Sequence, residues 1–214
     1  MSLELEWKSL WCAAGGKTSP VYPFKRLVER YSEPHRHYHT LDHISHCLWE
    51  LDPDGGFAHA RNENVVKMAL WYHDAVYDPR AHDNEERSAE IATTVLDVGG
   101  FPEEFIARVA TLVRATAHTT GPKDDDEAVL IDVDLAILGQ RADVFDEYEK
   151  QIRREYEFVP EEMFRTKRAE ILRRFLERPH IYHTASMRRQ YELLARQNLE
   201  HSIEQLTGVS ILRP

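Results

Sequence analysis

The chain is short of cysteines, of long apolar runs and of basic residues, and each shortage excludes a class of protein. Its two cysteines, Cys12 and Cys47, are too few for a disulfide-stapled fold and suit a reducing compartment. No apolar stretch approaches the roughly 20 residues of a membrane span. The start of the chain carries Glu4 and Glu6, where a signal peptide needs a basic region. We therefore expect a cytoplasmic protein that does not bind membranes.

Acidic residues outnumber basic ones along the 214-residue chain. It has 37 Asp and Glu against 27 Lys and Arg, a formal net charge of −10. This balance argues against a partner that is a nucleic acid polymer or an anionic membrane, because phosphate backbones reward clustered Lys and Arg. A small phosphorylated substrate is compatible with it, because a bound cation supplies local positive charge.

Apolar residues at helical spacing predict an all-α fold with about nine to eleven helices, and no β-hairpin signal competes. Asp83 as the N-cap and Glu86 at the third helical position predict a capping box. The segment 62–72 is apolar nearly all round, which predicts a central helix. Patterned segments lie at about 21–31, 41–51, 62–72, 83–98, 102–118, 128–138, 143–157, 160–177 and 184–206.

The adjacent pair His73 and Asp74 closes the apolar run 65–72. An imidazole and a carboxylate so placed can bind one divalent cation. His43 precedes this pair on a predicted helix, and Asp134 follows it inside another apolar run. A carboxylate is unfavourable in such surroundings unless a cation or strong donors face it. We therefore predict one metal site formed by these four residues.

Two neighbours compete for places in this ligand set. Asp132 lies in the same apolar run as Asp134, and His39 stands four residues before His43, a spacing that can itself bind metal on one helix face. We rank His43 above His39 because Ile44 and the apolar residues that follow it place His43 beside a buried stripe.

This order of residues resembles the HD-domain superfamily of metal-dependent phosphohydrolases, over about residues 38–139. The later part of the chain resembles a small bacterial branch of that superfamily. The resemblance implies one HD-type helical domain over residues 1–214, with a metal-site core at about 38–139 and a C-terminal helical extension at about 140–214. It also selects Asp134 over Asp132. The mixed nitrogen and oxygen donors suit Mn, Fe, Co, Ni, Zn or Mg.

The resemblance further implies hydrolysis of a small phosphorylated molecule such as a nucleotide, by attack of a metal-bound hydroxide on phosphorus. Asp74 would bind the metal and orient the attacking water. Several HD hydrolases carry a Glu and an Asp shortly after the His-Asp pair, but here Tyr77 stands where their Glu is found. We therefore expect Asp78 first and Glu85 second as the proton acceptor.

Candidate donors to a substrate phosphate are Arg36, His118, Lys123, Arg153 and Arg168. His118 resembles the extra histidine with which some HD proteins build a second metal site or contact phosphate. Two other classes stay open. A non-catalytic HD module that binds a nucleotide or a partner is favoured by Tyr77. An HD-type di-iron oxygenase is weaker, because it needs more histidine ligands than His118 alone supplies.

Overall fold

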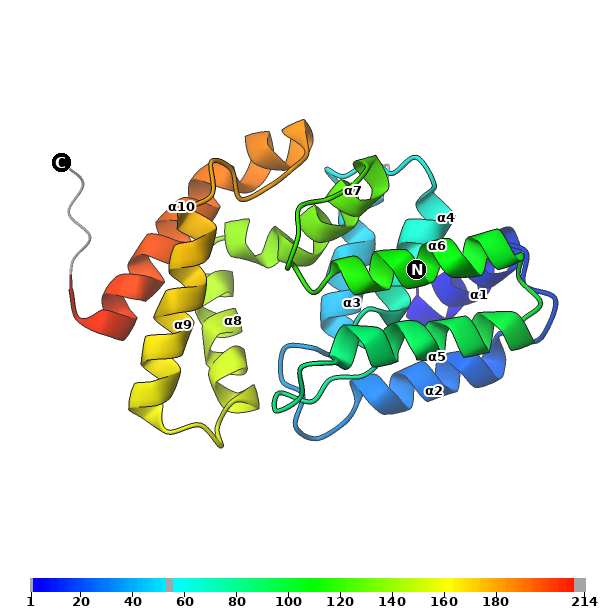
Figure 1. Ribbon diagram of the computed structural model, residues 1–214, viewed down its shortest axis with the longest axis horizontal. Helices are drawn as coiled ribbons and strands as arrows, with labels where there is room; N and C mark the ends of the chain where they lie inside the picture. The colour runs from blue at the N-terminus through cyan, green and yellow to red at the C-terminus, as the bar shows by residue number, and fades with distance from the viewer. Residues whose placement is uncertain (1, 53–55, 210–214) are drawn as a thin grey trace.

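The computed structural model describes residues 2–52 and 56–209, and within these ranges every regular element is a helix (Figure 1). The predicted all-α fold is therefore confirmed. The elements are α1 (Leu3–Ala13), α2 (Val21–Tyr31), α3 (Leu41–Glu50), α4 (Glu63–Tyr72), α5 (Asn84–Val98), α6 (Glu103–Ala115), α7 (Asp125–Asp134), the 3-10 helix η1 (Leu135–Gly139), α8 (Ala142–Glu155), α9 (Glu161–Leu176) and α10 (Ala185–Thr207). No helix in these ranges is both long enough and apolar enough to cross a lipid bilayer.

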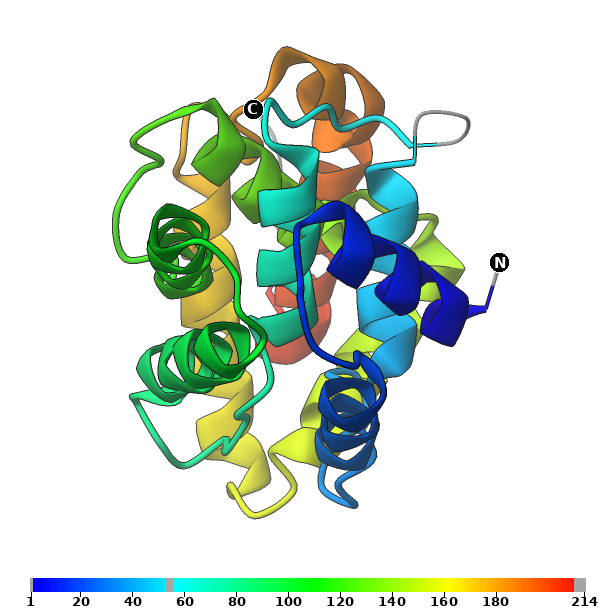
Figure 2. The same ribbon diagram turned by 90° about the vertical axis from the view of Figure 1, so that its right-hand side faces the viewer.

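Helices α1 to α7 form what we call the helical body, and α4 lies at its centre (Figure 2). This helix packs against α1, α3, α5, α6 and α7. Its residues from Met68 to Tyr72 are all buried, as expected for a helix that is apolar nearly all round. The indole of Trp7 on α1 meets that of Trp71 edge to face at 5.3 Å. The centre of the body thus fixes the end of α4, where His73 and Asp74 follow.

Helices α5 and α6 lie side by side over α4 and are joined by a tight turn in which Gly100 has a left-handed φ of 75°. The capping box predicted at the start of α5 is wrong. Asp83 is the N-cap residue, but its side chain makes no capping bond. Glu86 instead accepts two hydrogen bonds of 2.7 Å from the Arg114 guanidinium on α6. The ion pair between Arg114 and Glu86 therefore uses the carboxylate that the capping box would have needed.

Helices α8, α9 and α10 form what we call the C-terminal arm, which lies beside the body in Figure 1. Its α10 packs against α9 and against η1, the element that links body and arm. Asn198 on α10 donates to the carbonyl oxygens of Leu138 and Gln140 at 2.9 and 2.8 Å. The Tyr182 hydroxyl donates to Leu135 O at 3.1 Å. Polar side chains of the arm therefore satisfy the backbone of η1, which places the end of α7 next to the arm.

Candidate metal centre

Three helices of the body bring the four predicted ligands together. His43 lies on the buried face of α3, His73 and Asp74 directly follow α4, and Asp134 is the last residue of α7. His73 Nδ1 lies 2.8 Å from Leu70 O, and because a carbonyl only accepts, Nδ1 carries the proton there. The Nε2 lone pair of His73 is thereby free to face the other three residues, as in metal-binding histidines whose second nitrogen donates to a carbonyl.

The distances between the donor atoms suit one ion. His43 Nε2 and His73 Nε2 are 3.1 Å apart, and Asp134 Oδ1 lies 3.2 and 3.4 Å from them. Asp74 Oδ2 lies 3.0 Å from His73 Nε2 and 3.8 Å from His43 Nε2. Ligands at about 2.1 Å from one ion are roughly 3.0 to 3.4 Å apart when they are neighbours. The side chains present can therefore hold a metal ion.

The charges of the cluster also suit a cation. Burial raises the pKa of a carboxyl group, but the surrounding imidazoles, His73 foremost, together outweigh burial and hold the pKa of Asp74 and Asp134 below the usual value. Burial alone would lower the pKa of His73, yet the two carboxylates raise it well above the usual value. Because the two carboxylates favour a positive charge beside them, they would also favour a divalent ion. Such an ion displaces the proton when it binds.

The carboxylate of the competing candidate Asp132 points to a different partner. It accepts the backbone N–H groups of His183 and Thr184, both at 2.6 Å, at the start of α10. Asp132 is fully buried, and these two bonds compensate its charge. The structure therefore places Asp134, and not Asp132, beside the histidines.

Glu155 is a residue of this site that the sequence did not reveal. At the end of α8 it reaches the loop before α3, where Oε1 accepts the backbone N–H groups of His37, Tyr38 and His39 at 2.8, 2.8 and 3.0 Å. Its Oε2 lies 2.6 Å from His39 Nδ1. Burial would raise the pKa of Glu155, but these donors lower it to about 2. The arm thus supplies an anion that orients His39.

Tyr77 completes this arrangement. Its hydroxyl donates to Glu155 Oε2 at 2.7 Å, and its ring stacks on the His39 ring at 4.0 Å. The residue that stands at the expected Glu position therefore holds a carboxylate from elsewhere in the chain. The His39 side chain makes no hydrogen bond to His43, His73, Asp74 or Asp134. Its position therefore does not match the role of metal ligand that the sequence had suggested for it.

A cavity of about 420 Å³ opens directly on the cluster. His118 lies on its wall, with Nε2 3.0 Å from Asp134 Oδ2, and its backbone has a left-handed φ of 51°. A non-glycine residue adopts that conformation uncommonly, and such backbone strain gathers at functional sites. The lining residues that carry polar chemistry are His39, His73, Asp74, Tyr77, His82, Asn84, Glu85, Thr116, His118, Thr119, Asp134 and Tyr156.

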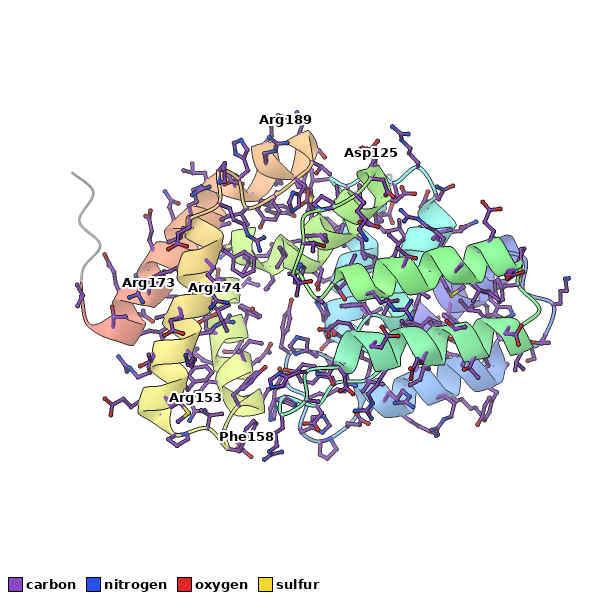
Figure 3. All side chains as sticks on the ribbon, in the orientation of Figure 1. Asp125, Arg153, Phe158, Arg173, Arg174 and Arg189 are labelled. Atoms are coloured by element: carbon purple, nitrogen blue, oxygen red, sulfur yellow. The ribbon has the colours of Figure 1, made fainter. Side chains whose placement is uncertain are left out.

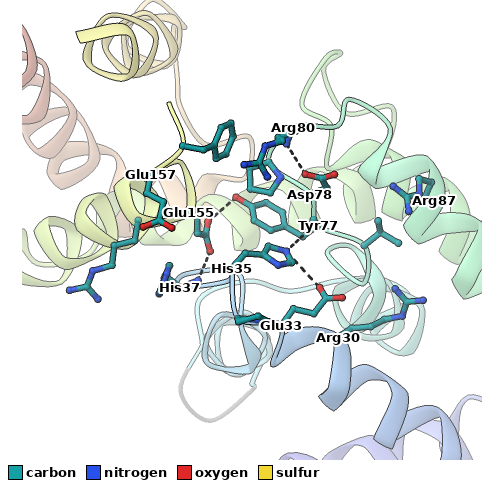
Figure 4. Close-up of a pocket in the computed structure, with 15 residues that line it drawn as sticks. Arg30, Glu33, His35, His37, Tyr77, Asp78, Arg80, Arg87, Glu155 and Glu157 are labelled. Carbon is teal, nitrogen blue, oxygen red and sulfur yellow. Dashed lines mark hydrogen bonds and ion pairs between the residues drawn. The ribbon is translucent and has the colours of Figure 1, made fainter. Parts of the chain in front are cut away.

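Asp78, expected first as proton acceptor, lies elsewhere. It lines a neighbouring cavity of about 470 Å³ on the other side of Tyr77, together with His35 and Arg80 (Figure 4). Its Oδ1 accepts the backbone N–H of Arg80 at 2.9 Å. The turn that follows His73 and Asp74 directs this side chain away from the cluster. Glu85, expected second, lines the cavity that opens on the cluster.

The Arg36 guanidinium does not reach the cavity, contrary to our expectation. It is buried and donates to Asp74 O at 2.7 Å, to His39 O at 3.2 Å and to a Glu33 carboxylate oxygen at 2.9 Å. Its donors are therefore committed to the protein. Arg36 joins the backbone before α3 to the backbone after α4. This link holds His43 in a fixed position relative to His73 and Asp74.

The other three basic candidates do not line the cavity either. Arg153, near the turn between α8 and α9 (Figure 3), donates to Tyr156 O at 2.6 Å. Arg168 donates to the Tyr148 hydroxyl at 2.9 Å and pairs with a carboxylate on α8. Lys123 lies in the loop before α7 and donates its backbone N–H to Glu127 at 2.8 Å. Of the predicted substrate contacts, only His118 lines the cavity.

Comparison with protein families, with curated proteins and with solved structures gives no match to this chain. The chemistry of the site therefore follows from its own donors. His43, His73 and Asp74 can hold a divalent ion, with Asp134 beside both histidines, and a polar cavity next to them can admit a small molecule.

Proposed function

We propose that this chain is a metal-dependent phosphohydrolase of the HD-domain type that acts on a small phosphorylated molecule such as a nucleotide. The observation that supports this most is the donor group of His43, His73 and Asp74, with Asp134 beside both histidines, next to a cavity of about 420 Å³ that His73, Asp74 and Asp134 line. That volume is typical of small-molecule sites. A divalent ion bound there lowers the pKa of a water molecule and polarises a phosphoryl oxygen.

The ligands we propose are His43, His73, Asp74 and Asp134, through the atoms whose distances are given above. Their nitrogen and oxygen donors accept Mn, Fe, Co, Ni, Zn or Mg. The bond from His73 to Leu70 O orients that imidazole before any ion arrives. Arg36 does the same for the Asp74 backbone.

For the proton acceptor we propose Glu85, in place of Asp78. Glu85 lies in the first turn of α5 and lines the cavity, whereas Asp78 does not. A proton acceptor must come within hydrogen-bonding reach of the attacking water, directly or through one further water. A carboxylate that lines the same cavity can come within that reach, whereas Asp78 lines the cavity on the other side of Tyr77.

For the proton donor we propose His39. Its Nδ1 is held by Glu155 and its ring by Tyr77, which leaves Nε2 for the cavity. Burial lowers the pKa of this imidazole, but Asp74 and Glu155 together raise it above the usual value. In its protonated form His39 would give this proton to the leaving oxygen of the substrate. His118 lines the same cavity, and its Nε2 would hold Asp134 in place through the bond of 3.0 Å to Oδ2.

The cavity lining also favours a class of substrate. Among the described residues that line it, none is Lys or Arg. The charge of the substrate would then be balanced by the ion and by histidines, which suits a monophosphate better than a polyphosphate. The rings of Tyr77 and Tyr156 offer flat surfaces for a base or another planar group.

Elemental analysis combined with a broad phosphoester panel tests this function. We expect the purified chain to retain near-stoichiometric metal and to release phosphate from at least one monophosphate, with activity lost on chelation and in Asp74→Ala. A fully loaded protein that releases no phosphate from any panel member would make a non-catalytic binding module the better conclusion. We propose a cytoplasmic location as well, because both cysteines are free thiols.

A further inference from the structure

A smaller cavity of about 190 Å³ adjoins the cavity of the metal cluster, and the two share His118 and Thr119 in their walls. Arg178 and His183, which also line the smaller cavity, come from the segment between α9 and α10 of the arm. Its volume is below the roughly 300 to 1,000 Å³ of a site for a whole ligand, so it suits one end of a small molecule. A molecule bound at the metal cluster could therefore extend past His118 into the smaller cavity.

The smaller cavity differs in charge from the chain as a whole. His118, Arg178 and His183 line it, and none of its described lining residues is Asp or Glu. Thr119 and Thr120 add hydroxyl groups, which can donate to an anion. The whole chain, by contrast, has a formal net charge of −10. A lining with basic but no acidic groups, in a protein with an excess of acids, favours an anionic ligand.

The Arg178 guanidinium is half-buried, and its central carbon lies 4.5 Å from the centre of the Phe175 ring. Burial lowers the pKa of this group, and no carboxylate in the described part of the chain raises it again. Arg153 and Arg168, by contrast, pair with carboxylates of α9 and α8. Arg178 is therefore the arginine of the arm that faces a cavity beside the metal cluster with its donors available for a ligand.

The basic groups of the smaller cavity lie close enough to affect one another. Burial lowers the pKa of His183, Asp132 raises it, and the positive charges of Arg178 and His118 lower it further. The Asp132 carboxylate already accepts two backbone N–H groups at 2.6 Å. The Nδ1 atom of His118 is buried and has no hydrogen-bond partner among the described residues. An anion among these groups would offset their repulsion, and a buried polar atom without a partner is often explained by an absent ion or water.

We propose that the smaller cavity binds a second anionic group of the substrate through Arg178 and His183. The substrate would then be a phosphomonoester that carries another phosphate or a carboxylate away from the reacting phosphate. This inference rests on the proposed function and narrows its substrate class. The reacting phosphate lies at the ion, in a cavity without Lys or Arg among its described lining residues, and the second anion lies past His118, where the arm supplies an arginine.

Calorimetric binding of phosphonates to the zinc-loaded full chain tests the inference without any turnover, because a phosphorus–carbon bond is not hydrolysed. Three series of increasing chain length are compared: alkylphosphonates with one anionic group, phosphonoalkanoates with an added carboxylate, and alkane diphosphonates with an added phosphonate. We expect one length at which a two-anion ligand binds at least tenfold more tightly than the alkylphosphonate of that length. The series with the larger gain identifies the second group as a carboxylate or a phosphate. Zinc content measured after each titration controls for extraction of the ion.

Arg178→Gln should remove this gain and leave the affinity for alkylphosphonates unchanged. Arg189→Gln is the matched control, because Arg189 is exposed and lines neither cavity, and it should keep the gain. His183→Gln supplies a second variant on the same wall and should lower the gain several-fold. Circular dichroism of each variant verifies that it is folded.

Two results would overturn the inference and leave the proposed function standing. In the first, alkylphosphonates bind to the zinc-loaded wild type, but no two-anion ligand of any length binds more tightly. In the second, the gain is found and survives in both Arg178→Gln and His183→Gln, which would place the second anion elsewhere. A chain that binds neither zinc nor any phosphonate would instead remove the proposed function, and this inference with it.

Discussion

The helical body and the C-terminal arm share one apolar core, and they differ in the polar contacts added to it. In the body, α4 is buried from Met68 to Tyr72, and aromatic rings such as Trp7 and Trp71 pack edge to face around it. The arm continues this core and packs on the body through rings such as Tyr38 and Tyr148, and buried polar groups, including Glu155 and Asn198, also join it to the body. Apolar packing holds both regions, and directed hydrogen bonds add to the alignment of the arm.

Helix α7 carries one carboxylate for each of these regions. Asp134 faces the histidines of the body, and Asp132, two residues earlier, binds the backbone just before the arm's last helix. The body thus contains the donors that could hold an ion, whereas the arm positions groups around them. Substitution of Asp134 should therefore change metal content and not folding, and substitution of Asp132 should change the free energy of unfolding and not metal content.

The largest effect is expected from Asp134→Ala. This variant should lose the metal ion completely, because the remaining donors leave one side of the ion open. The metal-free protein should stay folded, since removing a buried carboxylate also removes its desolvation penalty. Elemental analysis and denaturant unfolding measure the two properties. An Asp134→Ala protein that keeps its metal would place the ligands elsewhere.

The next effect is expected from Asp132→Ala. Two backbone N–H groups would lose their acceptor, which should lower the free energy of unfolding by about 3 kcal/mol. Metal content should be unchanged. Asp143→Ala, which removes an exposed carboxylate on α8, is the control and should change stability by less than about 0.5 kcal/mol. Loss of metal without loss of stability would reverse the assignments of the two carboxylates.

A third substitution concerns the proton acceptor of the body. Glu85→Gln should lower phosphate release by roughly 100-fold while the metal stays bound, the usual scale of general acid–base help. Asp78→Asn, in the neighbouring cavity, is the control and should keep wild-type turnover. If only Asp78→Asn lost turnover, the carboxylate behind Tyr77 would have to move toward the cluster during the reaction.

A smaller effect is expected from Glu155→Gln in the arm. The pKa of Glu155 falls from 4.5 to about 2 on folding, so the charged carboxylate stabilises the protein above pH 4.5, and this contribution is lost as the pH falls toward 2. Between pH 5 and pH 2 the wild type should lose about 2 kcal/mol more of its unfolding free energy than the variant does. Equal losses in denaturant unfolding would contradict the role of Glu155.

The partner of Glu155 works in the opposite direction. The pKa of His39 is raised above 6.5 in the folded protein. Its contribution to stability is therefore complete below pH 6.5 and is lost as the pH rises through the folded value. In His39→Gln the unfolding free energy should depend less on pH on the alkaline side of the profile. In Glu155→Gln it should depend less on pH on the acidic side.

The sequence predicted the elements whose pattern is local. Helix α4 was expected at 62–72 and spans Glu63–Tyr72, because an all-round apolar segment has only one stable place, the centre. Helices α8 to α10 lie within a few residues of their expected bounds for the same reason, an apolar stripe of helical period. Helix α1 was not identified, because Trp7, Leu10 and Trp11 are too few to define a period in a segment so short.

The groups around the cluster could not be predicted, because their roles depend on partners far along the chain. Nothing local distinguishes Arg36, which binds backbone oxygens, from an arginine that binds phosphate. In the sequence, Glu155 looks like any acidic residue near a helix end. Only the fold shows that its carboxylate accepts hydrogen bonds from residues more than 100 positions earlier. The same holds for Glu86, whose partner Arg114 competed with a local capping bond. A pattern in sequence states which residues are buried, and not which acceptor each donor finds.

The bond between His39 and Glu155 spans 116 residues, and this span has a consequence during synthesis. A ribosome that adds about 5 to 20 residues per second needs roughly 6 to 23 s between these two positions. Helices α3 to α7 can emerge and bring the metal ligands together within that interval, while the segment before α3 still has no acceptor for its N–H groups. The nascent chain would thus acquire an ion site first and an oriented His39 only when the end of α8 leaves the exit tunnel.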